Sequence, residues 1–203
     1  MLKYTQIKYI LDSIFALVLI VILSPMILII SLIVYLSDFG PVFYRGERVG
    51  LFGKVFKIYK FRTMVVNAEK SGVDSTANSD SRVTKIGWWL RKFKLDELAQ
   101  LLNILKGEMS FVGPRPEVKR FTDMYTTQEK KLLTLKPGMT DFASIWNFDE
   151  AKLLSDSKDP DKDYLEKIRP NKIKLQLKYL REISFTTDVK IIFLTLTKLI
   201  TRS

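Results

Sequence analysis

Asp96 and Glu97 form an acidic pair at the expected start of a helix, and they are the residues best suited to chemistry in this chain. Neighbours on a helix point about 100° apart, so the two carboxylates do not share a proton as a facing pair does. At a helix start both would lie beside free backbone N–H groups that also bind phosphate. One carboxylate could then attack a phosphorus atom while the other holds Mg²⁺. An ordinary capping Asp followed by a first-turn Glu accounts for the same residues, and spacing alone favours that alternative.

Three groups of basic residues are candidates for binding phosphate. They are Lys60 with Arg62, Arg91 with Lys92 and Lys94, and Arg115. Taken alone, each group is better explained as a solvated surface. Arg115 differs because Pro114 and Pro116 fix the backbone on both sides of it. This preorganises a guanidinium group that can bind two phosphate oxygens at once.

The composition narrows the chemistry further. The 203 residues include 33 Lys and Arg against 22 Asp and Glu, and the net charge of +11 favours phosphates, nucleic acid or an acidic membrane surface as partners. The chain has no Cys and no His, which excludes disulfides, thiol nucleophiles, Ser-His triads and imidazole metal sites. Any metal would therefore be a hard, oxygen-binding ion such as Mg²⁺. No recognised nucleic-acid module is present, so nucleic acid is not expected as a partner.

A long apolar segment lies near the N-terminus. The 25 residues Ser13–Ser37 carry no charge and would extend about 37 Å as a straight helix, enough to cross a hydrocarbon core of about 30 Å. Apolar residues occur on every face, which disfavours a buried core helix. The run is also too long for a secretory signal, and no cleavage site follows it. We therefore expect the segment to insert into a membrane.

A proline and the flanking charges indicate how this segment inserts. Ser24-Pro25 lies in the middle of the run, where proline removes a backbone hydrogen bond and kinks a helix. Basic residues precede the run at Lys3 and Lys8, and others follow it from Arg45 onward. Basic flanks mark the cytoplasmic side, so a helix that enters one leaflet, bends and returns satisfies both ends. We predict this re-entrant form, and a kinked spanning helix is the alternative.

The residues after this segment are expected to form a small α+β domain. Residues 42–45 and 55–62 alternate as strands of a β-hairpin around a glycine-rich turn, Gly46–Gly53. The alternation places Lys60 and Arg62 on one face at the end of the second strand.

Helices are expected in the later part of the chain. Helical spacing dominates residues 84–106, with a fresh start near Asp96, which could cap the new helix. Residues 188–200 are apolar but interrupted by Lys190 and Lys198, so they cannot span a membrane. An interfacial helix lying on the bilayer and a helix packed on the domain core explain this stretch about equally well.

Several motifs occur together in an order and spacing that match a known family. They are Ser24-Pro25, Tyr59–Met64, Leu95–Leu98 with Gln100, Leu101 and Asn103, Lys106–Ser110, Val112–Pro116, Lys136–Gly138 and the stretch Tyr179–Ile192. Through these residues the chain resembles the bacterial sugar transferases, the small monotopic polyprenol-phosphate phosphoglycosyl transferases that start glycan assembly on a lipid carrier. The resemblance implies a re-entrant membrane helix at residues 1–38. It also implies a domain with interfacial amphipathic helices, residues 39–203, on the cytoplasmic face of the bacterial inner membrane.

The resemblance further implies a two-step reaction. A carboxylate attacks the β-phosphorus of a UDP-sugar, which releases UMP and leaves a phosphosugar on the aspartate. Polyprenol phosphate, such as undecaprenyl phosphate, then attacks this intermediate and forms a polyprenol-diphosphate sugar. Carried over by motif, Asp96 is the nucleophile, and Glu97 assists it and shares a Mg²⁺ contact with it. The side chains implied to contact anionic groups of the substrates are those of Arg115, Lys60, Arg62 and Arg91.

Two departures from the family pattern limit this transfer. Ala99 stands where many members have Pro after Asp-Glu-Leu, and alanine suits a helix. Asp141–Ser144 stand where members commonly continue with Gly and then Ala-Gln. We therefore transfer no donor sugar, and the glycan pathway, the polyprenol length and the existence of a homo-oligomer are left open.

A non-catalytic alternative is a membrane-anchored module whose basic face binds acidic lipid or a partner protein. Such binding would weaken steeply with salt and would be indifferent to Asp96. This alternative leaves the Asp-Glu and Pro-Arg-Pro motifs unexplained.

Overall fold

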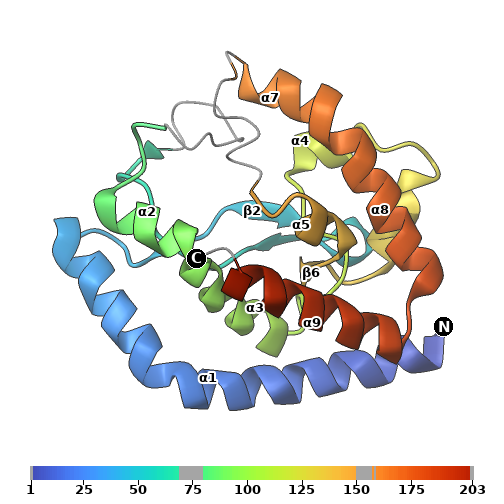
Figure 1. Cartoon of the computed structure of the whole chain (residues 1–203), viewed down its shortest axis with the longest axis horizontal. Helices are drawn as coiled ribbons and strands as arrows, with labels where there is room; N and C mark the ends of the chain where they lie inside the picture. The colour runs from blue at the N-terminus through green and yellow to red at the C-terminus, as the bar shows by residue number, and fades with distance from the viewer. Residues whose placement is uncertain (1, 69–79, 150–156, 158, 202–203) are drawn as a thin grey trace.

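The N-terminal helix α1, Leu2–Asp38, runs along one side of the molecule and bends partway along its length (Figure 1). The computed structural model describes residues 2–68, 80–149, 157 and 159–201. Pro25 lies inside α1, and the Ser24 hydroxyl donates to the Val21 carbonyl oxygen at 2.8 Å. The missing backbone N–H of the proline and this side-chain bond both favour a bend at the predicted motif.

Most of the apolar surface of α1 faces away from the rest of the chain. From Tyr4 to Asp38 the helix is long and apolar enough to cross a membrane, and only 11% of its 18-residue apolar window is buried. A core helix of a water-soluble domain would bury this surface, so α1 is suited to be a membrane anchor. Its exposed apolar side chains include Ile10, Phe15, Val21, Ile22, Leu28, Ile29 and Leu32.

Short strands form three ladders in the described residues. β1 (Phe43–Tyr44) pairs with β4 (Lys60–Phe61) and β2 (Glu47–Val49) with β3 (Val55–Lys57), both antiparallel, whereas β5 (Ser110–Val112) and β6 (Gly138–Thr140) are parallel. The predicted hairpin is confirmed in outline, but it is divided into two ladders, and the glycine-rich segment itself contributes β2. A 3₁₀ turn, η1 (Leu51–Gly53), reverses the chain after β2 with Phe52 and Gly53 at positive φ.

The helices that follow are short, except for two near the C-terminus. They are α2 (Lys85–Lys92), η3 (Leu95–Gln100), α3 (Leu101–Leu105), α4 (Lys119–Thr122), η4 (Glu129–Thr134), α5 (Phe142–Trp146), α7 (Pro160–Asp163), η5 (Tyr164–Ile168), α8 (Arg169–Glu182) and α9 (Phe185–Thr201). The helical region predicted over residues 84–106 consists of α2, η3 and α3, and the predicted break falls between α2 and η3. The expectation that Asp96 caps the new helix is wrong, because Lys94 occupies the N-cap position and Asp96 lies in the first turn of the 3₁₀ helix η3.

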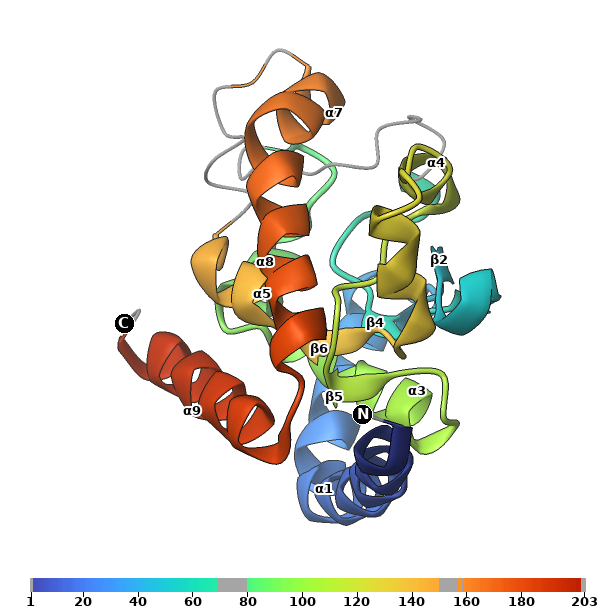
Figure 2. The same ribbon diagram turned by 90° about the vertical axis from the view of Figure 1, so that its right-hand side faces the viewer.

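Both halves of α1 pack against the same domain, which lies above the helix in Figure 2. On the N-terminal side of Pro25, Ala16 belongs to a buried cluster with Ile104 of α3. On the C-terminal side, Val34 belongs to a second cluster with Phe61 of β4. The two apolar clusters hold the bent helix against the domain on both sides of the bend.

Ion pairs join both ends of α1 to this domain. Near the N-terminus, Lys8 Nζ lies 2.6 Å from Asp188 Oδ2 of α9, and both side chains are buried. At the C-terminal end, the Arg62 guanidinium donates to the Asp38 carboxylate and, at 3.4 Å, to the Val34 carbonyl oxygen. A buried ion pair specifies geometry more than it adds stability, so these contacts fix where the helix ends lie.

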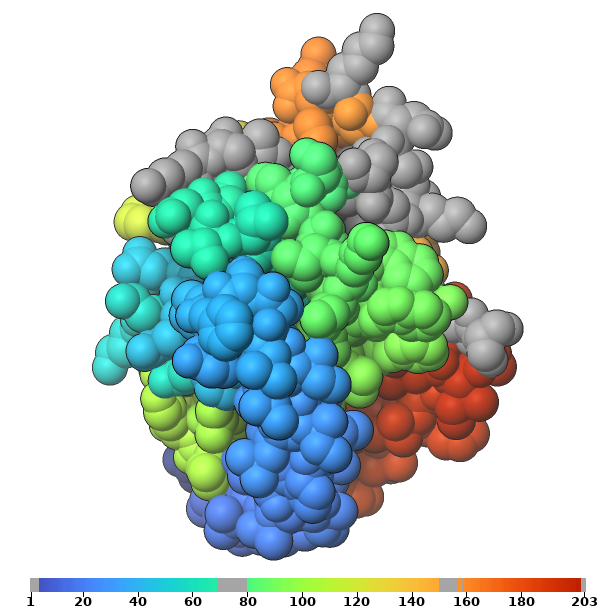
Figure 3. Space-filling view, turned by 90° about the vertical axis from the view of Figure 1, so that its left-hand side faces the viewer, coloured from blue at the N-terminus to red at the C-terminus, as the bar shows by residue number. Residues whose placement is uncertain are grey.

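Two further helices expose apolar side chains next to α1. α9 buries Ile191 against the domain but exposes Phe193 and Ile200, so one side fits a packed helix and the other has the apolar surface that an interfacial helix requires. On α2, Trp88 and Trp89 are exposed, and Figure 3 shows α2 beside α1 on one face of the molecule. α1, α2 and α9 thus each contribute to the exposed apolar surface.

Candidate active site

A tight turn places the acidic pair at the start of η3. Lys94 adopts a left-handed conformation with φ of 54°, which a non-glycine residue rarely adopts outside turns and functional sites. Its backbone N–H donates to the Arg91 carbonyl oxygen, and its own carbonyl oxygen accepts from the Glu97 N–H. α2 therefore ends and η3 begins within three residues, and Asp96 and Glu97 enter the first turn of the new helix.

Glu97 joins three segments of the chain. Its carboxylate accepts a hydrogen bond from Lys60 Nζ of β4 at 2.9 Å and from the guanidinium of Arg115, which follows β5. Burial by itself raises the pKa of Glu97, but the charges of Arg115 and Lys60 outweigh burial and hold the pKa well below its usual value. Glu97 is therefore a carboxylate that stays ionised.

Asp96 is in the opposite situation. Its side chain is buried, with 7% of its surface exposed, and its Oδ1 atom is buried without a hydrogen-bond partner in the described part of the chain. Burial raises the pKa of Asp96, and Lys60, Lys94 and Arg91 counteract that rise only in part. A buried acceptor without a partner costs free energy, so such an atom in a native structure calls for an explanation, and a catalytic role is one.

Two more basic residues lie on the same side. Arg91 of α2 donates from Nε to Thr63 Oγ1 at 2.8 Å, and its charge acts on Asp96. Lys94 acts on both Asp96 and Glu97, and burial lowers the pKa of Lys94. Lys94 belongs to one of the basic groups in the sequence but not to the predicted site residues, although its position two residues before Asp96 was a usable signal.

Arg62 does not join this group. β4 ends at Phe61, so the period-two alternation that placed Lys60 and Arg62 on one face stops before Arg62. Lys60 reaches Glu97, whereas Arg62 binds Asp38 at the end of α1. The structure thus brings together Lys60, Arg91 and Arg115 from the predicted anion-binding residues, whereas Arg62 binds the C-terminal end of α1.

Two glycines explain how the Arg115 loop is positioned. Gly113 precedes Pro114, and Gly138 ends the Lys-Pro-Gly motif at the start of β6. The Gly138 N–H donates to the Pro114 carbonyl oxygen at 3.0 Å, and a Cβ atom on Gly138 would lie 2.1 Å from the Gly113 nitrogen. The two motifs therefore pack backbone against backbone, and any side chain at Gly138 would displace the loop that carries Arg115.

The whole chain matches a family of known chemistry. A model of the bacterial sugar transferase family matches residues 3–202. The chain belongs to the bacterial sugar transferase family. This confirms the resemblance inferred from the motifs.

The names of several relatives refer to transfer to undecaprenyl phosphate. A Bacillus subtilis (strain 168) protein, provisionally named as an undecaprenyl-phosphate N-acetylgalactosaminyl 1-phosphate transferase, is 46% identical over 126 residues, which are 62% of this chain and 70% of that protein. The UDP-glucose:undecaprenyl-phosphate glucose-1-phosphate transferase of Escherichia coli (strain K12) is 37% identical over 92% of this chain and 39% of its own length. The UDP-N-acetylgalactosamine-undecaprenyl-phosphate N-acetylgalactosaminephosphotransferase of Aeromonas hydrophila is 33% identical over 98% of this chain and 44% of its own length. This chain thus spans less than half the length of the last two proteins.

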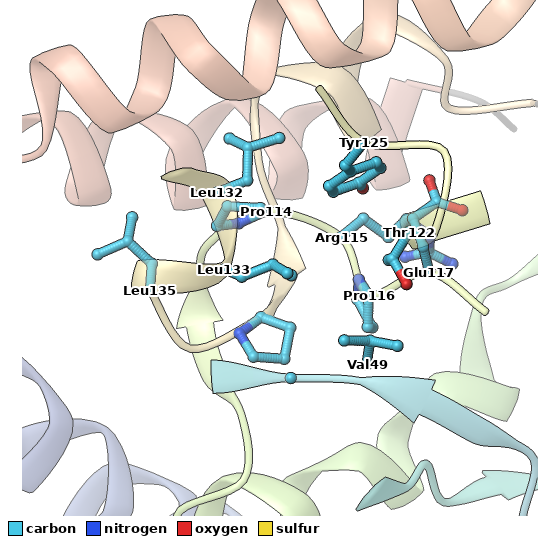
Figure 4. Close-up of a pocket in the computed structure, with 12 residues that line it drawn as sticks. Val49, Pro114, Arg115, Pro116, Glu117, Thr122, Tyr125, Leu132, Leu133 and Leu135 are labelled. Carbon is cyan, nitrogen blue, oxygen red and sulfur yellow. The ribbon is translucent and has the colours of Figure 1, made fainter. Parts of the chain in front are cut away.

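A small hollow lies beside the Arg115 loop and not around the acidic pair. Figure 4 shows Pro114, Arg115 and Pro116 around this hollow, with Tyr125 and Leu132 among the other lining residues. Neither Asp96 nor Glu97 lines it. The hollow therefore belongs to the packing around the Arg115 loop.

Near the acidic pair, the described residues offer few oxygen atoms that could bind a metal. Among the described residues, no group of three or more acidic side chains could enclose an ion. The available oxygens are the unpartnered Oδ1 of Asp96 and those of Glu97, which already binds Lys60 and Arg115. Mg²⁺ commonly takes one or two carboxylates and completes its coordination with water and substrate phosphate, so this pair fits Mg²⁺ better than an ion that needs a protein cage.

Proposed function

We propose that this protein is a phosphoglycosyl transferase that moves a phosphosugar from a UDP-sugar to undecaprenyl phosphate. It releases UMP and forms a polyprenol-diphosphate sugar, the first membrane step of glycan assembly. The observation that carries the proposal is the buried Asp96 Oδ1, which has no hydrogen-bond partner in the described residues and lies within the electrostatic reach of Lys60, Lys94 and Arg91. Membership of the family and the names of the relatives support the same reaction class.

In the first step the ionised Asp96 carboxylate attacks the β-phosphorus of the donor. A bond forms between a carboxylate oxygen and phosphorus, the bond between the β-phosphorus and the bridging oxygen breaks, and UMP leaves with the electron pair. In the second step a phosphate oxygen of undecaprenyl phosphate attacks the same phosphorus and releases the carboxylate. The two steps divide one transfer between two substrates into two displacements at a single site.

The neighbouring charges suit this chemistry. Both substrates carry phosphate charge, and Arg115, Lys60, Lys94 and Arg91 supply cationic groups that offset it. Arg115 and Lys60 currently bind Glu97, whose lowered pKa keeps it ionised and able to orient both cations. Arg62 we assign to holding the end of α1.

Mg²⁺ would be held by Asp96 and Glu97 together with phosphate oxygens of the donor. When bound, the ion neutralises charge on the diphosphate and makes UMP a better leaving group. The free Oδ1 of Asp96 supports this assignment.

For membrane topology we favour the re-entrant helix at residues 1–38 with the domain at 39–203 on the cytoplasmic face. The support is that both ends of α1, at Lys8 and Asp38, bind the same domain. If α1 crossed the bilayer, its ends would lie on opposite sides, and one domain could not bind both of them without entering the hydrocarbon. The exposed apolar side chains of α1, α2 and α9 would then face lipid.

The test of the reaction is UMP release from a panel of UDP-sugars with Mg²⁺, with and without undecaprenyl phosphate. With one donor we expect sustained UMP release when the acceptor is present and a burst of at most one UMP per enzyme without it. Asp96→Asn should lose both signals. Asp159→Asn, which alters the N-cap aspartate of α7, is the matched control and should keep them.

Two outcomes would overturn parts of this proposal. Turnover retained in Asp96→Asn removes Asp96 as the nucleophile. Folded wild-type protein that gives no burst with any donor, and binds acidic vesicles in a salt-dependent way, would support the non-catalytic alternative.

Topology has a direct test because the chain contains no cysteine. Single cysteines in Lys3→Cys and Lys54→Cys should react with a membrane-impermeant reagent from the same side of sealed vesicles. Labelling from opposite sides would establish a spanning helix.

A further inference from the structure

One face of α8 carries three buried polar residues, Lys172, Gln176 and Tyr179, whose spacing of four and three aligns them along the helix. In Figure 2, α8 runs down to the end of the domain where β5 and β6 lie. The Tyr179 hydroxyl donates to Asp188 Oδ1 at 2.7 Å and lies 3.2 Å from the Val112 carbonyl oxygen at the end of β5. Gln176 and Lys172 lie one and two turns closer to the N-terminus of α8, and they bind the carboxylates of Asp141 and Glu117.

The first of these carboxylates is Asp141, which has no exposed surface. One of its oxygens accepts from the Ser144 N–H at 2.6 Å and so caps α5. The other accepts from Gln176 Nε2 at 3.1 Å and from the backbone N–H of Arg115 at 3.3 Å. Asp141 therefore binds the backbone of the residue whose side chain reaches Glu97.

The second carboxylate is Glu117, two residues after Arg115. Its Oε1 atom lies 2.5 Å from Lys172 Nζ and accepts a hydrogen bond from the Tyr164 hydroxyl. Its backbone carbonyl oxygen accepts from the Val49 N–H of β2 at 2.9 Å. The chain is thus held on both sides of the guanidinium group, and α8 contributes a partner on each side.

We propose that Asp141, oriented by Gln176, is a positioning residue that sets the direction of the Arg115 side chain. The inference rests on the proposed reaction, in which Arg115 offsets phosphate charge, and it assigns Asp141 no contact with substrate. The backbone N–H and the side chain of Arg115 share one Cα atom, so a shift at the N–H moves the guanidinium. Pro114 and Pro116 fix only φ at their own positions, and the Asp141 carboxylate supplies the anchor that they lack.

The side chain needed at position 141 follows from these contacts. All three groups that face the Asp141 carboxylate are N–H donors, so both carboxylate oxygens must accept. In Asp141→Asn one oxygen becomes an NH₂ group, which must face a donor whichever way the amide is turned. The variant keeps the size of the side chain and changes only its hydrogen bonding.

The test is a double-mutant cycle on UMP release, with Asp141→Asn measured in the wild-type chain and in Arg115→Lys. A misplacement of about 1 Å can slow a reaction on the order of 100-fold, so we expect Asp141→Asn alone to lower kcat/KM by about 10- to 100-fold. In Arg115→Lys the bidentate group is already gone, and we expect Asp141→Asn to change kcat/KM less than about twofold. If Asp141→Asn lowers kcat/KM by the same factor in Arg115→Lys as in the wild-type chain, the proposal is overturned.

Controls separate positioning from loss of structure and from failure of the reaction itself. Thermal unfolding of each variant reports stability, and Asp159→Asn again provides a capping aspartate outside the site. If Asp141→Asn does not fold, Gln176→Leu takes its place in the cycle, because Gln176 reaches Arg115 only through Asp141 in the contacts described above. A wild-type chain without UMP release refutes the reaction, whereas an active wild type with independent effects refutes only the role of Asp141.

Discussion

Two buried clusters, each of which pairs acidic with basic side chains, lie next to the Arg115 loop, and they differ in how completely their polar atoms are paired. In the first, the Glu117 cluster, Glu117 is bound by Lys172 and by the Tyr164 hydroxyl, and Lys172 donates to that same hydroxyl at 2.9 Å. In the second, the Asp96 cluster, Glu97 is bound by Lys60 and Arg115, but the neighbouring Asp96 keeps an oxygen without a partner in the described residues.

The difference indicates which cluster does chemistry. A fully paired buried network fixes a structure. Removal of one of its charged groups leaves the partner charge buried and unpaired, which lowers stability. An unpaired carboxylate oxygen costs stability in every folded molecule, so it is retained where a ligand or a reaction uses it. By this criterion the Glu117 cluster supports the loop, and the Asp96 cluster is where we propose that the reaction takes place.

The largest effect should come from Asp96→Asn. Loss of a nucleophile typically costs about 10⁴-fold or more in turnover. Because burial already raises the pKa of Asp96, the neutral amide should leave the thermal unfolding temperature unchanged or higher. UMP release and thermal unfolding of the same preparation test both parts, and a marked loss of stability would place Asp96 among the supporting residues instead.

Lys172→Met should give the largest loss of stability among the ion-pair variants. It leaves the Glu117 carboxylate buried without its cation, which typically costs about 3–5 kcal/mol. The free energy of unfolding in denaturant measures the loss. A double variant, Lys172→Met with Glu117→Leu, removes both charges and should recover much of it, and equal losses in the single and double variants would contradict the assignment.

The pH dependence of that loss has a definite sign. Burial raises the pKa of Glu117, but Lys172 and the hydrogen bonds outweigh it, so the folded pKa lies below the unfolded value. In the wild type this stabilisation is present above about pH 4 and is lost as the pH falls through the folded pKa. In Lys172→Met burial dominates, the pKa of Glu117 is raised, and the variant loses stability as the pH rises above about 4. The difference in unfolding temperature between the wild type and Lys172→Met should therefore become smaller as the pH is lowered from 7 to 4. A constant difference would show that the charge on Glu117 is not the cause.

The residues of the Asp96 cluster could be selected from the sequence more easily than those of the Glu117 cluster, for a physical reason. Asp96, Glu97 and Arg115 stand in short motifs whose residue types reveal their chemistry, so they could be selected without a structure. Lys172 and Glu117 lie 55 positions apart, and no local pattern shows that a lysine in a basic helix binds a particular glutamate. Asp141 was noticed only as a departure from the family pattern, and its bond to the Arg115 backbone depends on how β5 and β6 pair.

Local geometry accounts for the remaining errors. Period-two alternation holds only within a strand, and β4 ends one residue before Arg62, which therefore binds the end of α1. Asp96 reads as an N-cap by residue type, but the left-handed turn at Lys94 moves the helix start two residues earlier. The hairpin and the apolar helix were predicted because period-two alternation and a long uncharged run depend on neighbours in sequence alone.

The smallest change in the free energy of unfolding should come from an exposed ion pair of a lysine and an acidic residue, the same kind of pair as Lys172 with Glu117. Lys119 and Asp123 form an ion pair one turn apart at 2.6 Å, yet their side chains are 70% and 59% exposed, against 7% and 8% for Lys172 and Glu117. Water screens such a pair, so Lys119→Met should change the free energy of unfolding by less than about 0.5 kcal/mol. Lys172→Met is the same substitution at a buried pair. The ratio of the two changes in the free energy of unfolding therefore measures how much burial increases the effect of losing the lysine. Comparable losses would mean that the long aliphatic stem of the lysine, and not the buried pairing of its charge, supports the Arg115 loop.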